Sequence, residues 1–161
     1  MRLTPLRARL AATVAACLAC VPAAAIVGSS TARAVDIVTS KDAPDLASVR
    51  AKIKAKEYHA ALVELRGLAD THQHADVYSL LGFSLRKTGD YAAALTFYKK
   101  ALDLDADHKG AHEYLGELHA ETGDLAKARE QLAVLAKLCP QGCEEREDLE
   151  KVLASAAPET K

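Results

Sequence analysis

The sequence predicts an all-α protein, a superhelix of about three helix hairpins followed by a C-terminal capping helix. Its 161 residues are 50% hydrophobic and 27% charged, which suits one compact domain. Aromatic residues make up only 4%, tryptophan is absent, and alanine and leucine supply most apolar content, which favours helices over a β-sandwich or barrel. The segment 87–94 recurs as 121–128, about 34 residues later. A helical repeat therefore explains both the composition and the period.

The charge of the chain argues against nucleic acid as a partner. The formal net charge is −1 at pH 7, and the sequence has no basic excess or basic stripe of the kind that phosphate binding requires. Residues 1–34 contain basic residues but no acidic ones, so a chain without them has a net charge of about −5. If residues 1–34 are removed, as we predict below, the remaining protein is small and acidic.

Residues 1–34 have the composition of a signal peptide. Three arginines and no acids precede an uncharged run over 10–27, which is the order of a basic n-region and an apolar h-region. Two triplets of small residues offer cleavage sites, Ala23-Ala24-Ala25 and Ala32-Arg33-Ala34. We expect cleavage after Ala34 and a periplasmic or secreted mature chain without a membrane span.

Two alternatives remain for this leader. The apolar run is long enough to be a retained membrane anchor, although it is rich in alanine and contains Pro22. The segment Val14-Ala15-Ala16-Cys17 is similar to a bacterial lipoprotein box, which would place a lipid on Cys17. In both cases the mature chain would stay attached to a membrane.

The rest of the chain divides at its prolines, glycines and polar segments. The predicted parts are a disordered lead-in over 35–44, a repeat domain over 45–156 with repeats at about 45–74, 75–108 and 109–142 and a capping helix over 143–156, and a disordered tail over 157–161. The first repeat is degenerate, because it lacks a Leu-Gly pair and its turn over 54–57 is one residue short. Its two helices still carry apolar residues at helical spacing, namely Leu46, Val49 and Ile53, then Tyr58, Ala61, Leu65 and Leu68.

The two central repeats share one pattern of apolar and small residues. One copy has Tyr78, Leu81, Gly82 and Leu85, then Ala94, Tyr98 and Ala101; the next has His112, Leu115, Gly116 and His119, then Ala128, Leu132, Leu135 and a closing Pro140. Gly82 and Gly116 allow the partner helix of each hairpin to approach closely. Gly89 and Gly123 suit the left-handed end of a first helix, and the aspartate after each suits the cap of the second helix.

This pattern resembles the tetratricopeptide repeat, whose first helix reads W-x2-L-G-x2-Y within a period of about 34 residues. The resemblance covers the middle of the chain. It implies a stack of helix hairpins that holds an extended peptide or helix in a concave groove formed by the first helix of each hairpin. It therefore implies a protein or peptide partner and no catalysis.

The capping helix is predicted from the same spacing. Leu149, Val152 and Leu153 stand where the apolar residues in the first helix of a fourth repeat would stand. The opposite face is charged and suits the solvent side of a cap, with Glu144, Glu145, Glu147, Asp148, Glu150 and Lys151. The early acids also lie where the helix dipole favours negative charge.

The histidines do not predict a metal site. His112 has helical spacing to His108 and to His119, but His112 and His119 occupy the aromatic core positions of a first helix and are interpreted as core residues. His72 and His74 form an isolated pair without a further ligand at metal-binding spacing. The sequence has no phosphate loop, no HExxH and no nucleophile beside an assignable base, so it predicts no enzyme, no cofactor and no metal.

Two cysteines flank a turn before the capping helix, in Cys139-Pro140-Gln141-Gly142-Cys143. Since the leader implies an oxidising compartment, a disulfide between Cys139 and Cys143 is the leading interpretation. Two thiols that only pack, or a thiolate metal or redox site, are the alternatives. The spacing is not C-x2-C, and no adjacent lysine or histidine would lower the pKa of either thiol.

The combined prediction is an exported, non-catalytic scaffold or adaptor. A periplasmic metal or thiol-redox carrier using the two cysteines, and a membrane-tethered accessory subunit, are the alternative functions. With the core stripe turned inward, other first-helix residues are predicted to line the groove: Ser79, Phe83, Arg86 and Lys87, then Glu113, Glu117, Ala120 and Glu121. The groove would change from a basic patch with an exposed Phe83 to an acidic row. The alternative is that these charges belong to ordinary solvated helix faces.

Overall fold

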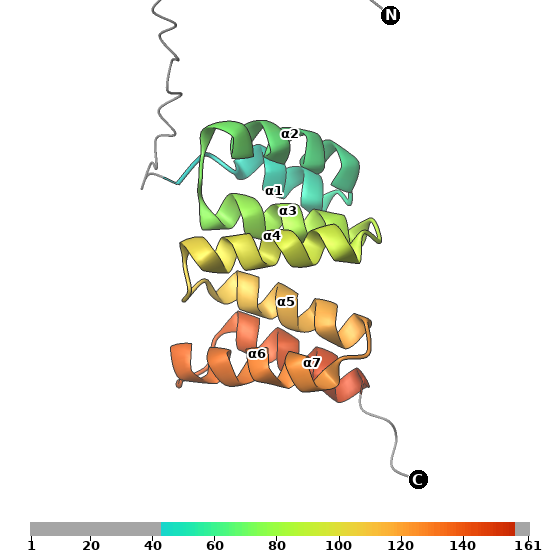
Figure 1. The fold of residues 1–161 in the computed structure, drawn as a ribbon, viewed down its shortest axis with the longest axis vertical. Coiled ribbons are helices and arrows are strands. Elements are labelled where there is room, and N and C mark those ends of the chain that lie inside the picture. The colour runs from blue at the N-terminus through green and yellow to red at the C-terminus, as the bar shows by residue number, and fades with distance from the viewer. Residues whose placement is uncertain (1–42, 157–161) are drawn as a thin grey trace, which may run out of the picture. The chain divides into compact units, whose positions relative to one another are not determined.

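The computed structural model describes residues 43–156, which form seven α-helices (Figure 1). They are α1 (Ala47–Lys54), α2 (Tyr58–Thr71), α3 (Ala75–Lys87), α4 (Tyr91–Leu104), α5 (Lys109–Glu121), α6 (Leu125–Leu138) and α7 (Glu144–Ala156). No strand occurs in this part of the chain, which confirms the all-α prediction. The predicted signal peptide, nearly all of the lead-in and the tail lie outside the described residues.

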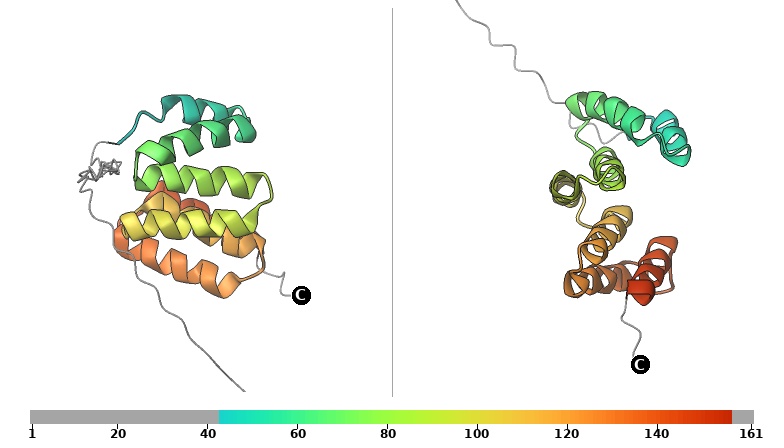
Figure 2. Two further views of the ribbon diagram at one scale, coloured as in Figure 1. Left: turned by 45° about the horizontal axis from the view of Figure 1, so that its top comes forward. Right: turned by 90° about the vertical axis from the view of Figure 1, so that its right-hand side faces the viewer.

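The helices stack in chain order as three hairpins and a cap. α1 packs on α2, α3 on α4 and α5 on α6, while α7 packs on both helices of the last hairpin. The right-hand view of Figure 2 shows α1, α3, α5 and α7 on one side of the stack and α2, α4 and α6 on the other. The side formed by α1, α3, α5 and α7 is called the inner face below.

The two predicted turns have the expected chemistry. Gly89 and Gly123 have φ angles of 89° and 83°, in the left-handed region that an L side chain rarely adopts. The carboxylate of Asp90 accepts a hydrogen bond of 3.0 Å from Ala93 N, and that of Asp124 accepts one of 3.1 Å from Lys127 N. Glycine therefore ends the first helix of each hairpin, and aspartate begins the second.

Gly82 and Gly116, the glycines of the repeat pattern, make close contacts with different kinds of partner. A Cβ atom on Gly82 would lie 2.5 Å from the ring of Tyr98 in α4, as the predicted contact within a hairpin requires. A Cβ on Gly116 would instead lie 2.5 Å from Leu149 in α7. The closest neighbour of Gly116 is therefore the cap, and not the second helix of its own hairpin as predicted. Leu132 stands where the earlier repeat has Tyr98, and the side chain nearest to Gly116 comes from the cap.

His112 is a core residue, as the sequence indicated. It is buried, with Nδ1 2.7 Å from Gln131 Oε1 and Nε2 2.9 Å from the Ala106 carbonyl oxygen. His119 is only half-buried. Within residues 43–156, no group of three or more His, Cys, Asp or Glu side chains is arranged to hold a metal ion. None of the helices described for this chain has both the length and the apolar content needed to cross a membrane.

Cys139 and Cys143 lie at the junction of α6 and α7. Their Cα atoms are 6.0 Å apart and their sulfur atoms are paired. Gly142 between them has a φ angle of 96°, so the turn uses the left-handed conformation. The pairing joins the end of the last hairpin to the start of the cap.

Candidate functional site

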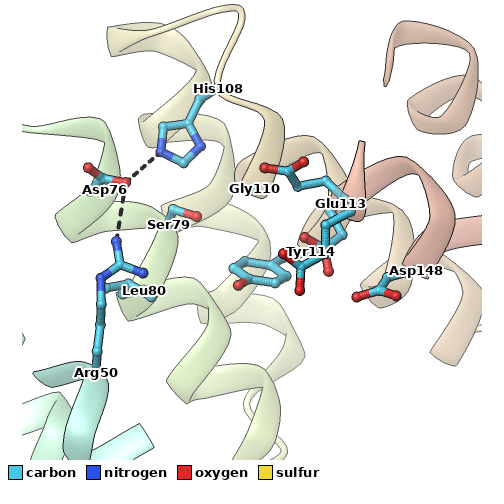
Figure 3. A pocket seen from close by; sticks show the side chains of 11 residues that line it. Arg50, Asp76, Ser79, Leu80, His108, Gly110, Glu113, Tyr114 and Asp148 are labelled. Carbon is cyan, nitrogen blue, oxygen red and sulfur yellow. Dashed lines mark hydrogen bonds and ion pairs between the residues drawn. The ribbon is translucent and has the colours of Figure 1, made fainter. Parts of the chain in front are cut away.

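A cavity of about 340 Å³ opens on the inner face and is lined from all four of its helices (Figure 3). Its lining residues are Arg50 of α1, Asp76, Ser79 and Leu80 of α3, Gly110, Glu113 and Tyr114 of α5, the α5 cap residue His108, and Glu144, Glu145 and Asp148 of α7. Five of these side chains are carboxylic acids, and one is an arginine. The stacking of hairpins thus brings together residues that are far apart in the sequence.

One end of the cavity is an ion-paired cluster around Asp76. His108 Nδ1 accepts a hydrogen bond of 2.9 Å from Ala111 N, so the proton of the neutral ring is on Nε2, 3.0 Å from Asp76 Oδ1. A guanidinium nitrogen of Arg50 lies 3.8 Å from the same Asp76 oxygen (Figure 3). The hydrogen bond from His108 is the main reason that the pKa of Asp76 is lowered, and nearby positive charge adds to it. The charge of Asp76 is therefore already matched inside the protein.

The other end of the cavity is acidic and unmatched. Glu113 is only 9% exposed, and burial raises its pKa to about 8. Burial is the largest cause of this rise, the carboxylates of Glu117, Asp148 and Glu145 contribute to it, and Arg86 opposes it. Burial also raises the pKa of the neighbouring Tyr114 to about 12. At neutral pH, therefore, the Glu113 carboxyl is mostly protonated in the folded protein.

Glu113 should make the protein less stable at alkaline pH. Its pKa rises from an ordinary 4.5 to about 8 on folding, so its contribution to stability is complete below pH 4.5 and is lost as the pH rises through 8. We expect Glu113→Gln to match the wild type at pH 5 and to exceed it at pH 9 by more than about 1 kcal/mol. Urea unfolding at both pH values measures this. Glu130→Gln, at an exposed position on α6, is the control, and an equal change in both variants would contradict the prediction.

Three of the residues predicted to line an exposed groove are buried instead. Ser79 is 2% exposed and Arg86 3%, and Glu113 is also buried. Ser79 and Glu113 still belong to the cavity wall. Arg86 does not, because its guanidinium forms ion pairs with Glu117 and Glu121 and donates a hydrogen bond from Nε to the Tyr98 hydroxyl. Arg86 is therefore not part of an exposed basic patch as predicted, because it pairs with Glu117 and Glu121 between α3 and α5, and this group keeps one excess negative charge.

Phe83 is also not the exposed aromatic residue that the sequence suggested. Its ring is half-buried, with its centroid 4.8 Å from that of Tyr114 and 6.3 Å from that of Tyr58. Lys87 is exposed, as predicted, but its Nζ lies 5.3 Å from the centre of the Phe83 ring. Phe83 packs neighbouring repeats together, so Phe83→Ala is expected to lower stability as well as any binding.

Most of the residues that line the cavity were not predicted from the sequence. Arg50, Asp76 and Tyr114 were not singled out, and His108 was considered only as a metal ligand. His74 and His108 nevertheless stand 34 residues apart before successive first helices, and each caps one. Glu144, Glu145 and Asp148 were assigned to the outer face of a cap, yet they form one wall of the cavity. The acids of α7 could have been noticed because α7 is in phase with the first helices, whose remaining residues face inward.

Comparison with known proteins agrees with this architecture. Two family models described as tetratricopeptide repeat match residues 46–108 and 85–142. No match was found among curated protein sequences. Among solved structures, the Yersinia enterocolitica type III secretion translocator chaperone SycD is similar, with 18% identity over 68% of this chain and 83% of SycD, and a TM-score of 0.59.

A second solved protein, PcrH, is similar in two complexes. PcrH with the chaperone binding region of PopD has 18% identity over 68% of this chain and 86% of PcrH, with a TM-score of 0.60. PcrH with the chaperone binding region of PopB has 20% identity over 69% of this chain and 90% of PcrH, with a TM-score of 0.57. At these identities the similarity concerns the fold alone.

Proposed function

Because the chain belongs to the tetratricopeptide repeat family, we propose that it is a non-catalytic module that binds a segment of a partner protein on its inner face. The observation that carries this proposal is the cavity, which draws its lining from all four inner helices. Binding sites are usually concave and contain a few converging polar groups, as this cavity does. PcrH, which has a similar fold, is described in complex with the chaperone binding regions of two other proteins, and this supports the same use of the fold.

The proposal is tested by filling the cavity without disturbing the helices. Gly110 is on the cavity wall, and a Cβ there would lie an ordinary 3.5 Å from its nearest neighbour, on His108. Gly110→Leu should therefore block the cavity and keep the fold. Gly67→Leu is the matched control, because Gly67 is exposed on α2 and a Cβ there would meet nothing within 4 Å.

A displayed library of random twelve-residue peptides supplies the probe. We expect the full mature chain to select peptides whose binding falls at least tenfold with Gly110→Leu and is unchanged with Gly67→Leu. Circular dichroism and thermal unfolding should show that both variants remain folded. Peptides that bind Gly110→Leu as well as the wild type, or a selection that yields none above background, would refute binding on the inner face.

We further propose that the module is exported. The support is the basic n-region, the uncharged run and the small residues ending at Ala34. In an expressing bacterium, intact-mass measurement of the envelope fraction should find a chain that begins at or near Val35. Ala34→Lys should prevent this cleavage, whereas Ala25→Lys, in the other small-residue triplet, should not. A full-length product in the cytosol would contradict export.

In an oxidising compartment, the proposal includes a structural disulfide between Cys139 and Cys143. Closing this short loop should stabilise the fold by about 2 kcal/mol, chiefly by holding α7 on the last hairpin. Cys143→Ser should therefore lower the free energy of unfolding by that amount and speed hydrogen exchange in α7. Adding a reductant should remove the difference between variant and wild type. Equal stability under oxidising conditions would show that the cysteines contribute no structural bond.

A further inference from the structure

One buried polar group on the cavity wall, the Ser79 hydroxyl, lacks a hydrogen-bond partner among residues 43–156, and the poorly exposed Glu113 lies near it. The Ser79 hydroxyl is buried and has no hydrogen-bond partner, and Ser79 as a whole is 2% exposed. Glu113 is 9% exposed as a residue, but its carboxyl oxygens are not among the fully buried atoms, so its carboxyl group is open to the cavity. Figure 3 shows the Ser79 hydroxyl pointing toward the space bordered by Glu113 and Tyr114. Buried polar groups normally have partners, so this part of the cavity has unused capacity for a polar ligand.

The residues around this part of the cavity are acidic. In the described part of the chain, no cation pairs with Glu113, Glu144 or Glu145, and Asp148 pairs only with the exposed Lys151. The charge at the opposite end is different, because Asp76 is held by His108 and Arg50. The electrostatic complement of the α5 and α7 side of the cavity is therefore a cation that also donates hydrogen bonds.

We infer that this cavity receives a basic side chain, lysine or arginine, of the bound segment. The ammonium or guanidinium group would lie between the carboxylates of α5 and α7, with the Ser79 hydroxyl as a further hydrogen-bond acceptor. Both side chains have an apolar stem, which suits Leu80 and Tyr114 on the same wall. This inference rests on the proposed function, since it names the chemistry of the segment that the inner face binds.

Binding of a basic side chain should depend on pH. Glu113 faces Glu117 on its own helix, Glu145 and Asp148 on α7, and Arg86 on α3, and its pKa in the free protein is about 8. A bound cation favours the carboxylate form, so binding at pH 7 should release a proton, and affinity should increase as the pH rises from 6 to 8. Calorimetry in buffers of different ionisation enthalpy measures this release.

The peptides selected on the wild-type chain test the inference. We expect them to share at least one lysine or arginine, and replacement of that residue by norleucine or citrulline to weaken binding at least tenfold. Glu113→Gln and Glu145→Gln should each weaken the basic peptide and have little effect on its neutral analogue. Glu147→Gln is the matched control, because Glu147 is exposed on the same helix and does not line the cavity.

The possible failures can be told apart. Peptides that are lost with Gly110→Leu but need no basic residue would overturn this inference and leave the proposed function intact. Equal affinity of the basic peptide for the wild type and for Glu113→Gln would also overturn it. The same holds if calcium or magnesium ions bind in a Glu113-dependent way while the selected peptides need no basic residue. Peptides that are insensitive to Gly110→Leu would refute the proposed function itself.

Discussion

Replacing Glu117 and Glu121 together by glutamine is expected to lower the free energy of unfolding by about 3 to 5 kcal/mol. The two carboxylates neutralise Arg86, whose side chain is 1% exposed. Burial opposes the charged form of Arg86, yet its pKa is raised overall because Tyr98 and the two glutamates surround it. Without them, the folded protein would hold a buried positive charge with only the Tyr98 hydroxyl as a hydrogen-bond partner among the described residues, beside the Phe83 ring 5.5 Å away.

Removing Arg86 instead of the two glutamates should lower the free energy of unfolding by a smaller amount. The Glu117 and Glu121 side chains are 16% and 36% exposed, so water can hydrate them when Arg86→Met removes their partner. We expect Arg86→Met to cost about half as much as the double glutamine variant. Combining all three substitutions should recover most of the loss, because an apolar replacement of a whole buried ion pair is often neutral. Urea unfolding of the four proteins gives these differences, and a double variant as stable as the wild type would contradict the argument.

Gly82→Leu is expected to cost about 3 kcal/mol, because the position has no room for a side chain. A Cβ would lie 2.5 Å from the ring of Tyr98, which is fully buried and hydrogen-bonded to Arg86. The ring cannot move away without breaking that bond or entering the core. Thermal and urea unfolding measure the loss, and a stable Gly82→Leu would show that α3 and α4 do not contact each other in this register.

Leucine substitutions at Gly116 and Gly67 are expected to have different effects from Gly82→Leu. Gly116→Leu should cost more than about 1 kcal/mol, and shortening its neighbour by Leu149→Ala should make the same substitution less costly. A rescue by Leu149→Ala would place the contact between α5 and α7, and its absence would contradict that placement. Gly67→Leu, on an exposed part of α2, should instead stabilise the protein by a few tenths to about 1 kcal/mol, since leucine favours the helix.

The features that depend on neighbouring residues could be predicted from the amino-acid sequence. Helical spacing of apolar residues identifies each buried stripe, and the period of about 34 residues identifies the hairpins. Gly89 and Gly123 occupy turns with positive φ, and Asp90 and Asp124 cap the helices that follow. These outcomes require only the conformational preferences of glycine and the hydrogen-bonding reach of an aspartate side chain.

The residues that stay accessible on the inner face could not be predicted in this way, because they depend on how the hairpins pack against each other. Arg86, Glu117 and Glu121 looked like separate charged faces, but α3 and α5 lie close enough for them to form one ion-paired group. Similarly, α7 packs on α5 and turns part of its acidic face into a wall of the cavity. The physical reason is that a repeat period specifies the helices, whereas the distance between first helices depends on the side chains packed between hairpins. In this chain those include the Phe83 and Tyr114 rings and the close contact of Leu149 with Gly116.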